Sequence, residues 1–164
     1  MQTPAGFDIR FSEERDLDFL TRYFADPAAC DDFPFSPDEA ADVLKNWIGF
    51  SKFKASLTGL INDEPCAIAT LFLMPYRKVA HHASFFVAVD PAHRNQGIGT
   101  SMIRNIMNLA KNRFRLESVN VEIYEPSLLL PIVEKLGFLP FAKQPDFVRM
   151  ENVHRPRILL ECML

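Results

Sequence analysis

Residues 82–110 read HASFFVAVDPAHRNQGIGTSMIRNIMNLA, and this stretch predicts the fold class of the chain. The run from His82 to Val89 is dense in Phe, Val and Ala, as expected of a buried strand. Asp90 and Pro91 form a turn signal, and apolar residues recur at helical spacing from Ile98 onward. A strand, a glycine-containing turn and a long helix in this order indicate an α/β protein.

The turn between that strand and that helix contains Gly97-Ile98-Gly99. Glycines let the backbone approach a ligand closely, and the first N–H groups of a helix lack internal partners, so a phosphate can bind there. A P-loop would need Lys directly after Gly99, and a dinucleotide-binding loop would need Gly or Ala at Met102, so both are excluded. Residues 94–99, RNQGIG, fit the pattern (R or Q)-x-x-G-x-(G or A), in which backbone amides hold the pyrophosphate of coenzyme A. The alternative is a tight strand-to-helix turn that binds nothing.

Turn and periodicity signals predict the elements on either side of this unit. The run from Ser36 to Glu39 reads as a capping box with proline in the first helical turn, and it predicts a helix start. Asn62 to Pro65 has turn composition between two strand-like runs, which predicts a hairpin. The expected strands cover residues 7–11, 53–61, 66–74, 82–89, 116–124 and 157–163, and the expected helices begin after Ser12, at Ser36, after Gly97 and at Ser127.

The stretch from Phe86 to Gly99 resembles the acetyl-CoA-binding motif of the GNAT superfamily of N-acetyltransferases. Residues 134–138, EKLGF, resemble the second signature of that family, a helix end followed by Gly-Phe. The part from His82 onward is also similar to a bacterial subgroup that acetylates small molecules and amino acids. The resemblance implies a single acetyltransferase domain over residues 1–164. Its fold would be α/β, with a mixed, mostly antiparallel central sheet whose central strands splay apart, flanked by about four helices.

The resemblance implies that acetyl-CoA is the co-substrate and that an amine attacks its thioester directly. Backbone groups of Val87 and Val89 would bind the pantetheine arm, and the amide of Val87 or Ala88 would polarise the thioester carbonyl. Arg94 begins the loop and would reach a phosphate, or would be a solvated surface charge instead. The predicted cofactor-binding residues are Val87, Ala88, Val89, Arg94, Asn95, Gln96, Gly97, Ile98, Gly99, Thr100 and Ser127.

The predicted strand at residues 116–124 alternates strictly, which places Asn120, Glu122 and Tyr124 on one of its faces. An amine substrate arrives protonated, because its unperturbed pKa is about 10.4, so a general base must remove a proton. Glu122 is the first candidate for that base. An ion pair at the end of the strand is its alternative role.

The sequence departs from the family in the helix before the Gly-Phe pair. Many members have a Tyr there that protonates the departing thiolate, but this chain has Val133, and Pro126 replaces an Asn near the start of the helix. Tyr124 or Ser127 would then supply the proton, or the thiolate would leave without an acid, because a free thiol has a pKa of only about 8.5. The predicted catalytic residues are Glu122 and Tyr124.

Composition and charge exclude several classes of partner. Eighteen basic residues against twenty-one acidic ones give a net charge of −3, the wrong sign for a protein that neutralises nucleic-acid phosphates. The longest apolar stretch, Ala67 to Met74, is far shorter than a membrane span of about 20 residues. The three cysteines form no C-x-x-C pair, which predicts reduced thiols in a cytoplasmic protein. No spacing of His, Cys and Asp predicts a metal site.

In the family, the first two helices and the strands beside the splayed centre build the acceptor site. Aromatic rings with an acidic rim in this region predict a pocket for an ammonium group on an apolar body. A Phe-rich core is the alternative for most of the rings, with one or two lining the pocket. We expect a small-molecule amine or amino-acid-like acceptor, and the resemblance is compatible with a homodimer. The residues are Phe33, Phe35, Trp47, Phe50, Phe53, Tyr76 and Phe85, with Asp26, Asp31 and Asp32.

The predicted function is therefore acetyl-CoA-dependent N-acetyl transfer to a primary amine in a ternary complex. The missing Tyr and Asn keep an alternative open, a catalytically silent module that binds an acyl-CoA and acts as a sensor or a partner. Release of free CoA that depends on an added amine separates the two hypotheses.

Overall fold

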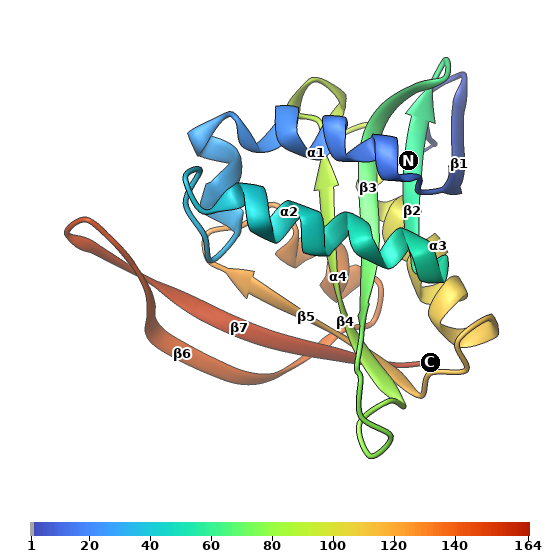
Figure 1. Ribbon diagram of the computed structural model, residues 1–164. Helices are drawn as coiled ribbons and strands as arrows, with labels where there is room; N and C mark the ends of the chain where they lie inside the picture. Colours follow the sequence, from blue (N-terminus) through green and yellow to red (C-terminus); the bar gives the residue numbers. More distant parts are fainter. Residues whose placement is uncertain (1) are drawn as a thin grey trace.

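In the computed structural model, which describes residues 2–164, seven strands form one sheet in the order β1-β2-β3-β4-β5-β7-β6 (Figure 1). The strands are β1 (Phe7–Phe11), β2 (Ser56–Ile61), β3 (Glu64–Leu73), β4 (His82–Val89), β5 (Ser118–Tyr124), β6 (Leu139–Met150) and β7 (Val153–Met163). The helices are α1 (Leu17–Phe24), α2 (Ala40–Gly49), α3 (Ile98–Asn112) and α4 (Leu130–Lys135), with 3₁₀ turns η1 (Glu14–Asp16), η2 (Pro27–Asp32), η3 (Phe50–Phe53) and η4 (Pro91–His93). This arrangement confirms the predicted fold class.

The centre of the sheet is split between β4 and β5. These strands run parallel, whereas the other neighbouring strands of the described sheet run antiparallel. They pair only from His82 opposite Ser118 to Ser84 opposite Asn120, although both continue well beyond that point. The two strands therefore diverge toward their carboxyl ends, as the resemblance implied.

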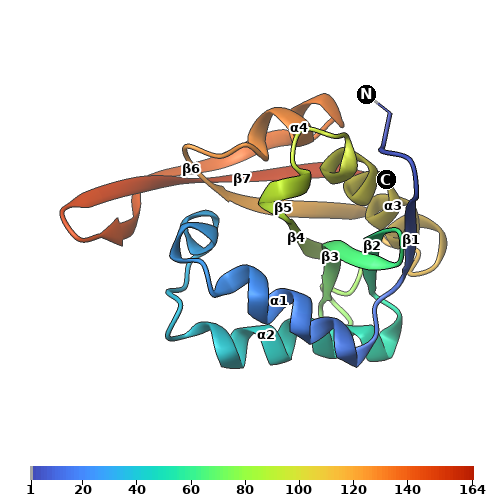
Figure 2. The same ribbon diagram turned by 90° about the horizontal axis from the view of Figure 1, so that it is seen from above.

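Helices cover both faces of the sheet (Figure 2). On one face α1 and α2 pack through an aromatic core that includes Phe24 and Trp47. On the other face α3 and α4 pack through a core that includes Ile103, Ile106 and Val133. Figure 2 shows β6 and β7 reaching out beyond both layers as a two-stranded arm. The split in the sheet therefore lies between a layer formed by α1 and α2 and a layer formed by α3 and α4.

Sequence reasoning missed β6 and placed the start of β7 too late. β7 begins at Val153 rather than Arg157, and nearly all of β6 is exposed, so neither an apolar run nor an apolar face marks it. Pro140 and Pro145 also interrupt it, and proline is normally excluded from a strand interior. β6 tolerates both because it is the edge strand of the sheet, with irregular register opposite β7.

Several predicted boundaries were also early. α1 begins at Leu17 after a 3₁₀ turn, and β2 begins at Ser56 because Phe53 belongs to η3. The capping contacts predicted before α2 do form, since the Ser36 N–H and hydroxyl donate to the Glu39 carboxylate at 2.9 and 2.7 Å. They close a separate turn, however, and the helix itself starts one residue after Glu39.

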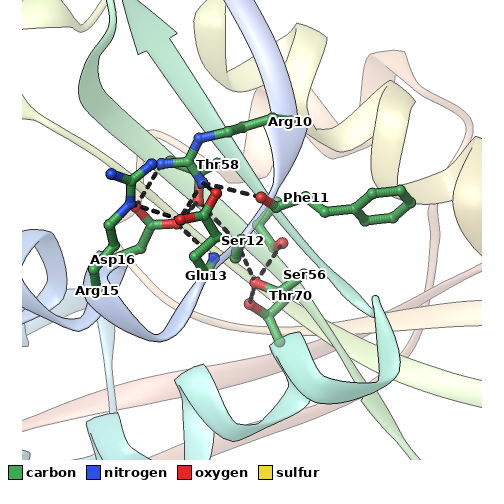
Figure 3. A network of polar contacts seen from close by, with 10 residues as sticks. Arg10, Phe11, Ser12, Glu13, Arg15, Asp16, Ser56, Thr58 and Thr70 are labelled. Carbon is green, nitrogen blue, oxygen red and sulfur yellow. Dashed lines mark hydrogen bonds and ion pairs between the residues drawn. The ribbon is translucent and has the colours of Figure 1, made fainter.

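A buried polar network joins β1, β2 and η1 (Figure 3). The Arg10 guanidinium donates to both oxygens of the Asp16 carboxylate, at 2.7 and 2.9 Å, and the Thr58 hydroxyl donates to the same group at 2.9 Å. Burial alone would raise the pKa of Asp16, but these donors and the Glu13 N–H outweigh it and lower that pKa below its ordinary value.

The network continues through hydroxyl groups to the aromatic core. Tryptophan can only donate and a carboxylate can only accept, so the hydroxyls between them must all donate in one direction. The chain of donors runs from Trp47 Nε1 through Thr70, Ser56, Ser12 and Thr58 to Asp16, over distances of 2.6 to 2.9 Å.

Candidate functional site

The split between β4 and β5 exposes unpaired backbone groups of β4. Asp90 N donates to Cys66 O at 2.8 Å, so this register position faces β3. Because backbone groups at successive positions point to opposite edges of a strand, Ala88 also faces β3, whereas Val87 and Val89 face the split. Of the two amides predicted to polarise a carbonyl, the geometry favours Val87.

A tight turn leads from the end of β4 into α3. Asn95 and Gly97 have positive φ angles of 59° and 75°, a region open to glycine and tolerated by asparagine. The Ser101 N–H donates to Gly97 O at 3.0 Å, as the first hydrogen bond within the helix. The amides of residues 98–100 precede it and have no acceptor inside the helix, so they can receive an anion.

Gly99 leaves open the space between α3, α4 and β4. A Cβ atom added there would lie 3.7 Å from Val89 Cγ2 and 3.8 Å from Ile132 Cδ1, which are ordinary contacts. Packing therefore does not require glycine at this position. Close approach of a ligand to the backbone would require a small residue there, in line with the Gly or Ala of the motif.

A polar hollow of about 430 Å³ lies beside this turn. Arg104 supplies its positive charge, and sequence reasoning did not single this residue out. The available signal was spacing, because Arg104 lies four residues after Thr100 and so shares its helix face. A phosphate at the start of α3 would meet free amides and a guanidinium together. The lining residues are Gln2, Thr3, Gly97, Thr100, Ser101, Arg104 and Asn105.

Arg94 is hydrogen-bonded within the protein, and its contact with a phosphate stays a prediction. Its Nη2 donates to the Tyr23 hydroxyl at 3.1 Å and its Nε donates to Val89 O at 3.4 Å. The side chain thus ties the end of β4 to α1. Burial raises the pKa of Tyr23 despite the neighbouring guanidinium, so this phenol stays protonated at neutral pH.

Glu122 and Tyr124 lie together on β5. Glu122 Oε1 accepts a hydrogen bond from the Tyr124 hydroxyl at 2.5 Å and forms an ion pair with Arg157 Nη1 at 2.9 Å. Burial and the adjacent carboxylate raise the pKa of Tyr124. The Phe147 ring of the arm stacks on the Tyr124 ring, with centroids 6.0 Å apart. The Arg157 guanidinium carbon lies over the Phe147 ring, 3.7 Å from its centroid. The ion pair considered as the alternative role of Glu122 is therefore present.

The start and middle of α4 show what replaces the family's residues. Val133, at the position of the family's Tyr, has no hydroxyl, and its side chain is fully buried in the core. The Ser127 hydroxyl accepts from Leu129 N at 3.1 Å and lowers the pKa of the Asp32 carboxylate. Ser127 is not among the residues that line the hollow at α3.

A second hollow, of about 510 Å³, lies where the split opens, between η2, the end of β5 and the tip of the arm. Arg155 holds these walls together. Its guanidinium donates to the backbone oxygens of Tyr124, Glu125 and Pro126 at 2.9, 2.8 and 2.9 Å, and also to Asp31 O. The lining residues are Asp31, Asp32, Pro126, Met150, Glu151, Val153 and Arg155.

The predicted aromatic pocket is mostly core. Phe33 and Trp47 are buried against each other, with centroids 5.7 Å apart, and Phe85 lies on the opposite face of the sheet, where it packs against Phe138. Phe53 and Tyr76 are exposed, and none of the seven predicted rings lines the hollow at the split. The apolar walls of this hollow are Pro126, Met150 and Val153 instead, and an acceptor pocket lined by one or two of the rings stays a prediction.

Among residues 2–164, no group of three or more His, Cys, Asp and Glu side chains is placed to hold a metal ion. No helix in the same part of the chain is both long and apolar enough to cross a membrane. The three cysteines, Cys30, Cys66 and Cys162, are free thiols.

Comparison with known proteins gives a family match and many structural matches. The family model described as "Acetyltransferase (GNAT) family" matches residues 19–138. No curated protein is similar enough in sequence to count as a match.

Three solved structures illustrate the structural matches. A GCN5-related N-acetyltransferase from Kribbella flavida is 15% identical with a TM-score of 0.82, over 99% of this chain and 100% of that one. The yncA protein of Salmonella typhimurium, with its cofactor acetyl-CoA, is 16% identical with a TM-score of 0.81, over 96% and 94%. Spermidine N-acetyltransferase from Vibrio cholerae, with CoA and spermine, is 12% identical with a TM-score of 0.79, over 98% and 96%. At these identities the likeness establishes the fold.

Proposed function

Because the chain belongs to the GNAT acetyltransferase family, we propose that it transfers the acetyl group of acetyl-CoA to a primary amine, by direct attack in a ternary complex. The observation that carries this proposal is the split between β4 and β5. The strand β4 borders this split and leads through the glycine turn into α3. A cofactor lying along β4 would place its pyrophosphate on the free amides of α3 and its pantetheine arm in the split.

The proposed cofactor site uses backbone groups almost throughout. Val87 and Val89 would bind the pantetheine arm, and the amide of Val87 would stabilise the oxyanion formed from the thioester. The turn from Asn95 to Thr100 would hold the pyrophosphate, with Arg104 as its cation. The structures from Salmonella typhimurium and Vibrio cholerae, which were solved with acetyl-CoA and with CoA, support a cofactor of this kind.

Tyr124 and Glu122 remain the catalytic candidates named from the sequence. Tyr124 keeps its proton at neutral pH, because its pKa is raised, and it would supply a hydrogen bond to the departing thiolate. Glu122 orients that hydroxyl and would also be the base if it could leave its ion pair with Arg157. Glu122→Gln and Tyr124→Phe test these roles separately.

The acceptor is proposed to be a small-molecule amine that enters from the face covered by α1 and α2. The Vibrio cholerae enzyme in the comparison was solved with spermine, a small-molecule amine.

We also propose a homodimer, because β6 leaves a long open edge with exposed Leu139 and Phe141. A cytoplasmic location is part of the same proposal.

Release of free CoA tests the enzyme against the silent acyl-CoA-binding module. The protein is incubated with acetyl-CoA, with and without a panel of primary amines, and the thiol released is measured over time. Release that depends on the amine supports the proposal. Binding of acetyl-CoA without amine-dependent release would favour the silent module, which the buried Val133 and the Pro126 position keep open.

A further inference from the structure

The hollow at the open end of the split is lined by a carboxylate, Asp32, that forms no ion pair among the described residues. Asp32 is half-buried at the end of η2, and the cations that influence its charge are the guanidinium groups of Arg94 and Arg155. Arg94 donates to Val89 O and the Tyr23 hydroxyl, and Arg155 donates to backbone oxygens. Within residues 2–164, neither forms a salt bridge with Asp32.

Asp32 lines the hollow together with Pro126, which follows the end of β5, and with Arg155 of the arm. Its neighbour in the chain, Asp31, accepts a hydrogen bond from Arg155 through its backbone oxygen. The charge of Asp32 also interacts with Arg94, whose Nε donates to Val89 O at the end of β4. A cation that binds in the hollow therefore has this carboxylate in the wall around it. Glu122, by comparison, already accepts from Tyr124 and Arg157.

We infer that Asp32, rather than Glu122, binds the ammonium group of the acceptor and takes its proton. This inference rests on the proposed acetyl transfer. Asp32 removes one proton from the ammonium, and the amine nitrogen then bonds to the thioester carbonyl carbon. The carbon–sulfur bond breaks, CoA leaves as a thiolate, and the second nitrogen proton goes to that thiolate directly or through water. Asp32 afterwards returns its proton to solvent, so the products are the acetylated amine, CoA thiol and one proton.

The walls of the hollow also define the class of acceptor. Asp31 and Glu151 stand beside Asp32, and Pro126, Met150 and Val153 supply apolar surface. Arg155 has its guanidinium donors on backbone oxygens, so it is not free to read a substrate carboxylate. The hollow suits a cation with an apolar body and no carboxylate. Phenethylamine and phenylalanine form a matched pair of probes, since they differ only in the carboxylate.

The electrostatics of Asp32 agree with its role as a proton acceptor, because they make it a stronger base than an ordinary aspartate. Burial raises its pKa above the ordinary aspartate value and Asp31 adds to this effect, while Arg94, Arg155 and Ser127 oppose it. Tyr23 faces it from α1 and Glu151 from the turn of the arm. A carboxylate with a raised pKa destabilises the fold when it is ionised, so replacing Asp32 with a neutral amide should stabilise the protein above the ordinary aspartate pKa. A purely structural anion would show the opposite effect.

The test compares Asp32→Asn with Asp31→Asn, which removes the same charge one residue away, and with Glu122→Gln. For phenethylamine we expect Asp32→Asn to lower kcat/KM about a hundredfold or more and to abolish the acidic limb of its pH profile. Asp31→Asn should raise KM a few fold and keep that limb. Affinity for acetyl-CoA should be unchanged in all three variants, and phenylalanine should be at least about tenfold worse than phenethylamine.

Thermal melting supplies a readout that does not need turnover. Asp32→Asn should raise Tm near pH 8 and lose this gain near pH 3, where Asp32 is neutral in the parent. A lowered Tm near pH 8, an intact acidic limb, or loss of that limb in Glu122→Gln instead would overturn the inference. Preference for phenylalanine would overturn the acceptor class. A parent that fails to bind acetyl-CoA would contradict the proposed function itself, which is a different result from any of these.

Discussion

At Gly99 the absence of a side chain, rather than its presence, shapes the candidate site. The two atoms that would lie nearest to a methyl group added there, on Val89 and Ile132, are at ordinary contact distance, so the fold itself would accept alanine. The backbone conformation would also accept alanine, because Gly99 lies within the helix α3 and does not have a left-handed conformation. Its role was predictable from the sequence because the motif is local. For Asp32, the sequence predicts a place in an acidic rim, but it does not predict the cations Arg94 and Arg155 that influence this carboxylate, because they come from distant parts of the chain.

Gly99→Ala should separate folding from cofactor binding. We expect the free protein to gain about 0.5–1 kcal/mol in unfolding free energy, because alanine is the better residue in a helix. Affinity for acetyl-CoA should stay close to that of the parent, because the pyrophosphate-binding motif accepts alanine as well as glycine at this position. Urea denaturation and calorimetry measure the two effects, and a variant that is less stable, or that no longer binds acetyl-CoA, would contradict this interpretation of Gly99.

Asp16→Asn should destabilise the protein by about 2–4 kcal/mol at neutral pH, because it breaks a buried pair and leaves Arg10 with only the longer, exposed contact to Glu13. The pKa of Asp16 is lowered in the fold, so its stabilisation is present above the ordinary aspartate pKa and is lost as the pH falls through the folded-state value. The difference between parent and variant should therefore shrink below about pH 4. Asp18→Asn, an exposed change in the first turn of α1, should stay within about 0.5 kcal/mol at every pH.

Among the elements, the arm formed by β6 and β7 and the turn η2 complete the site. Arg155 of β7 donates to the segment from Tyr124 to Pro126 and to Asp31 O, so one side chain fixes both walls of the hollow. The strands β1 and β4 and the start of the helix α3 were predictable to within a residue, because each carries a clear periodicity or glycine signal. The arm was not, because an exposed edge strand with two prolines has no such signal.

Arg155→Lys should destabilise the protein by about 2–4 kcal/mol and raise KM for the amine. A single ammonium group cannot donate to the several backbone oxygens that the planar guanidinium reaches together, and unsatisfied carbonyls would remain. Chemical denaturation and steady-state kinetics give the two quantities. Arg149→Lys, on the exposed neighbouring strand, is the matched control and should change neither; equal effects of the two variants would argue against the clamp.

At the scale of the whole molecule, the fold forms two separate hollows. One hollow lies at the start of α3 and the other lies between η2 and the arm. The sequence motif predicts the first, because strand, turn and helix follow one another along the chain. The second joins segments more than a hundred residues apart, such as Asp31 and Arg155, and only the fold brings them together.

The open edge of β6 bears on the state of association. Light scattering during gel filtration should give twice the chain mass of 18.7 kDa for the parent. Phe141→Lys should shift the protein toward the monomer, because a charge on an open edge opposes strand pairing. A parent that elutes as a monomer at all concentrations would contradict the proposed homodimer and leave the catalytic proposal intact.

The measurement that bears most directly on the proposed function is acetyl-CoA binding by calorimetry. We compare the parent with Gly99→Glu, which puts a carboxylate against the free amides of α3, and with Gly49→Glu, which adds the same charge where a Cβ meets nothing within 4 Å. The account predicts a Kd on the order of micromolar for the parent and for Gly49→Glu, and loss of binding for a folded Gly99→Glu. No binding by the folded parent, or equal binding by Gly99→Glu, would contradict it.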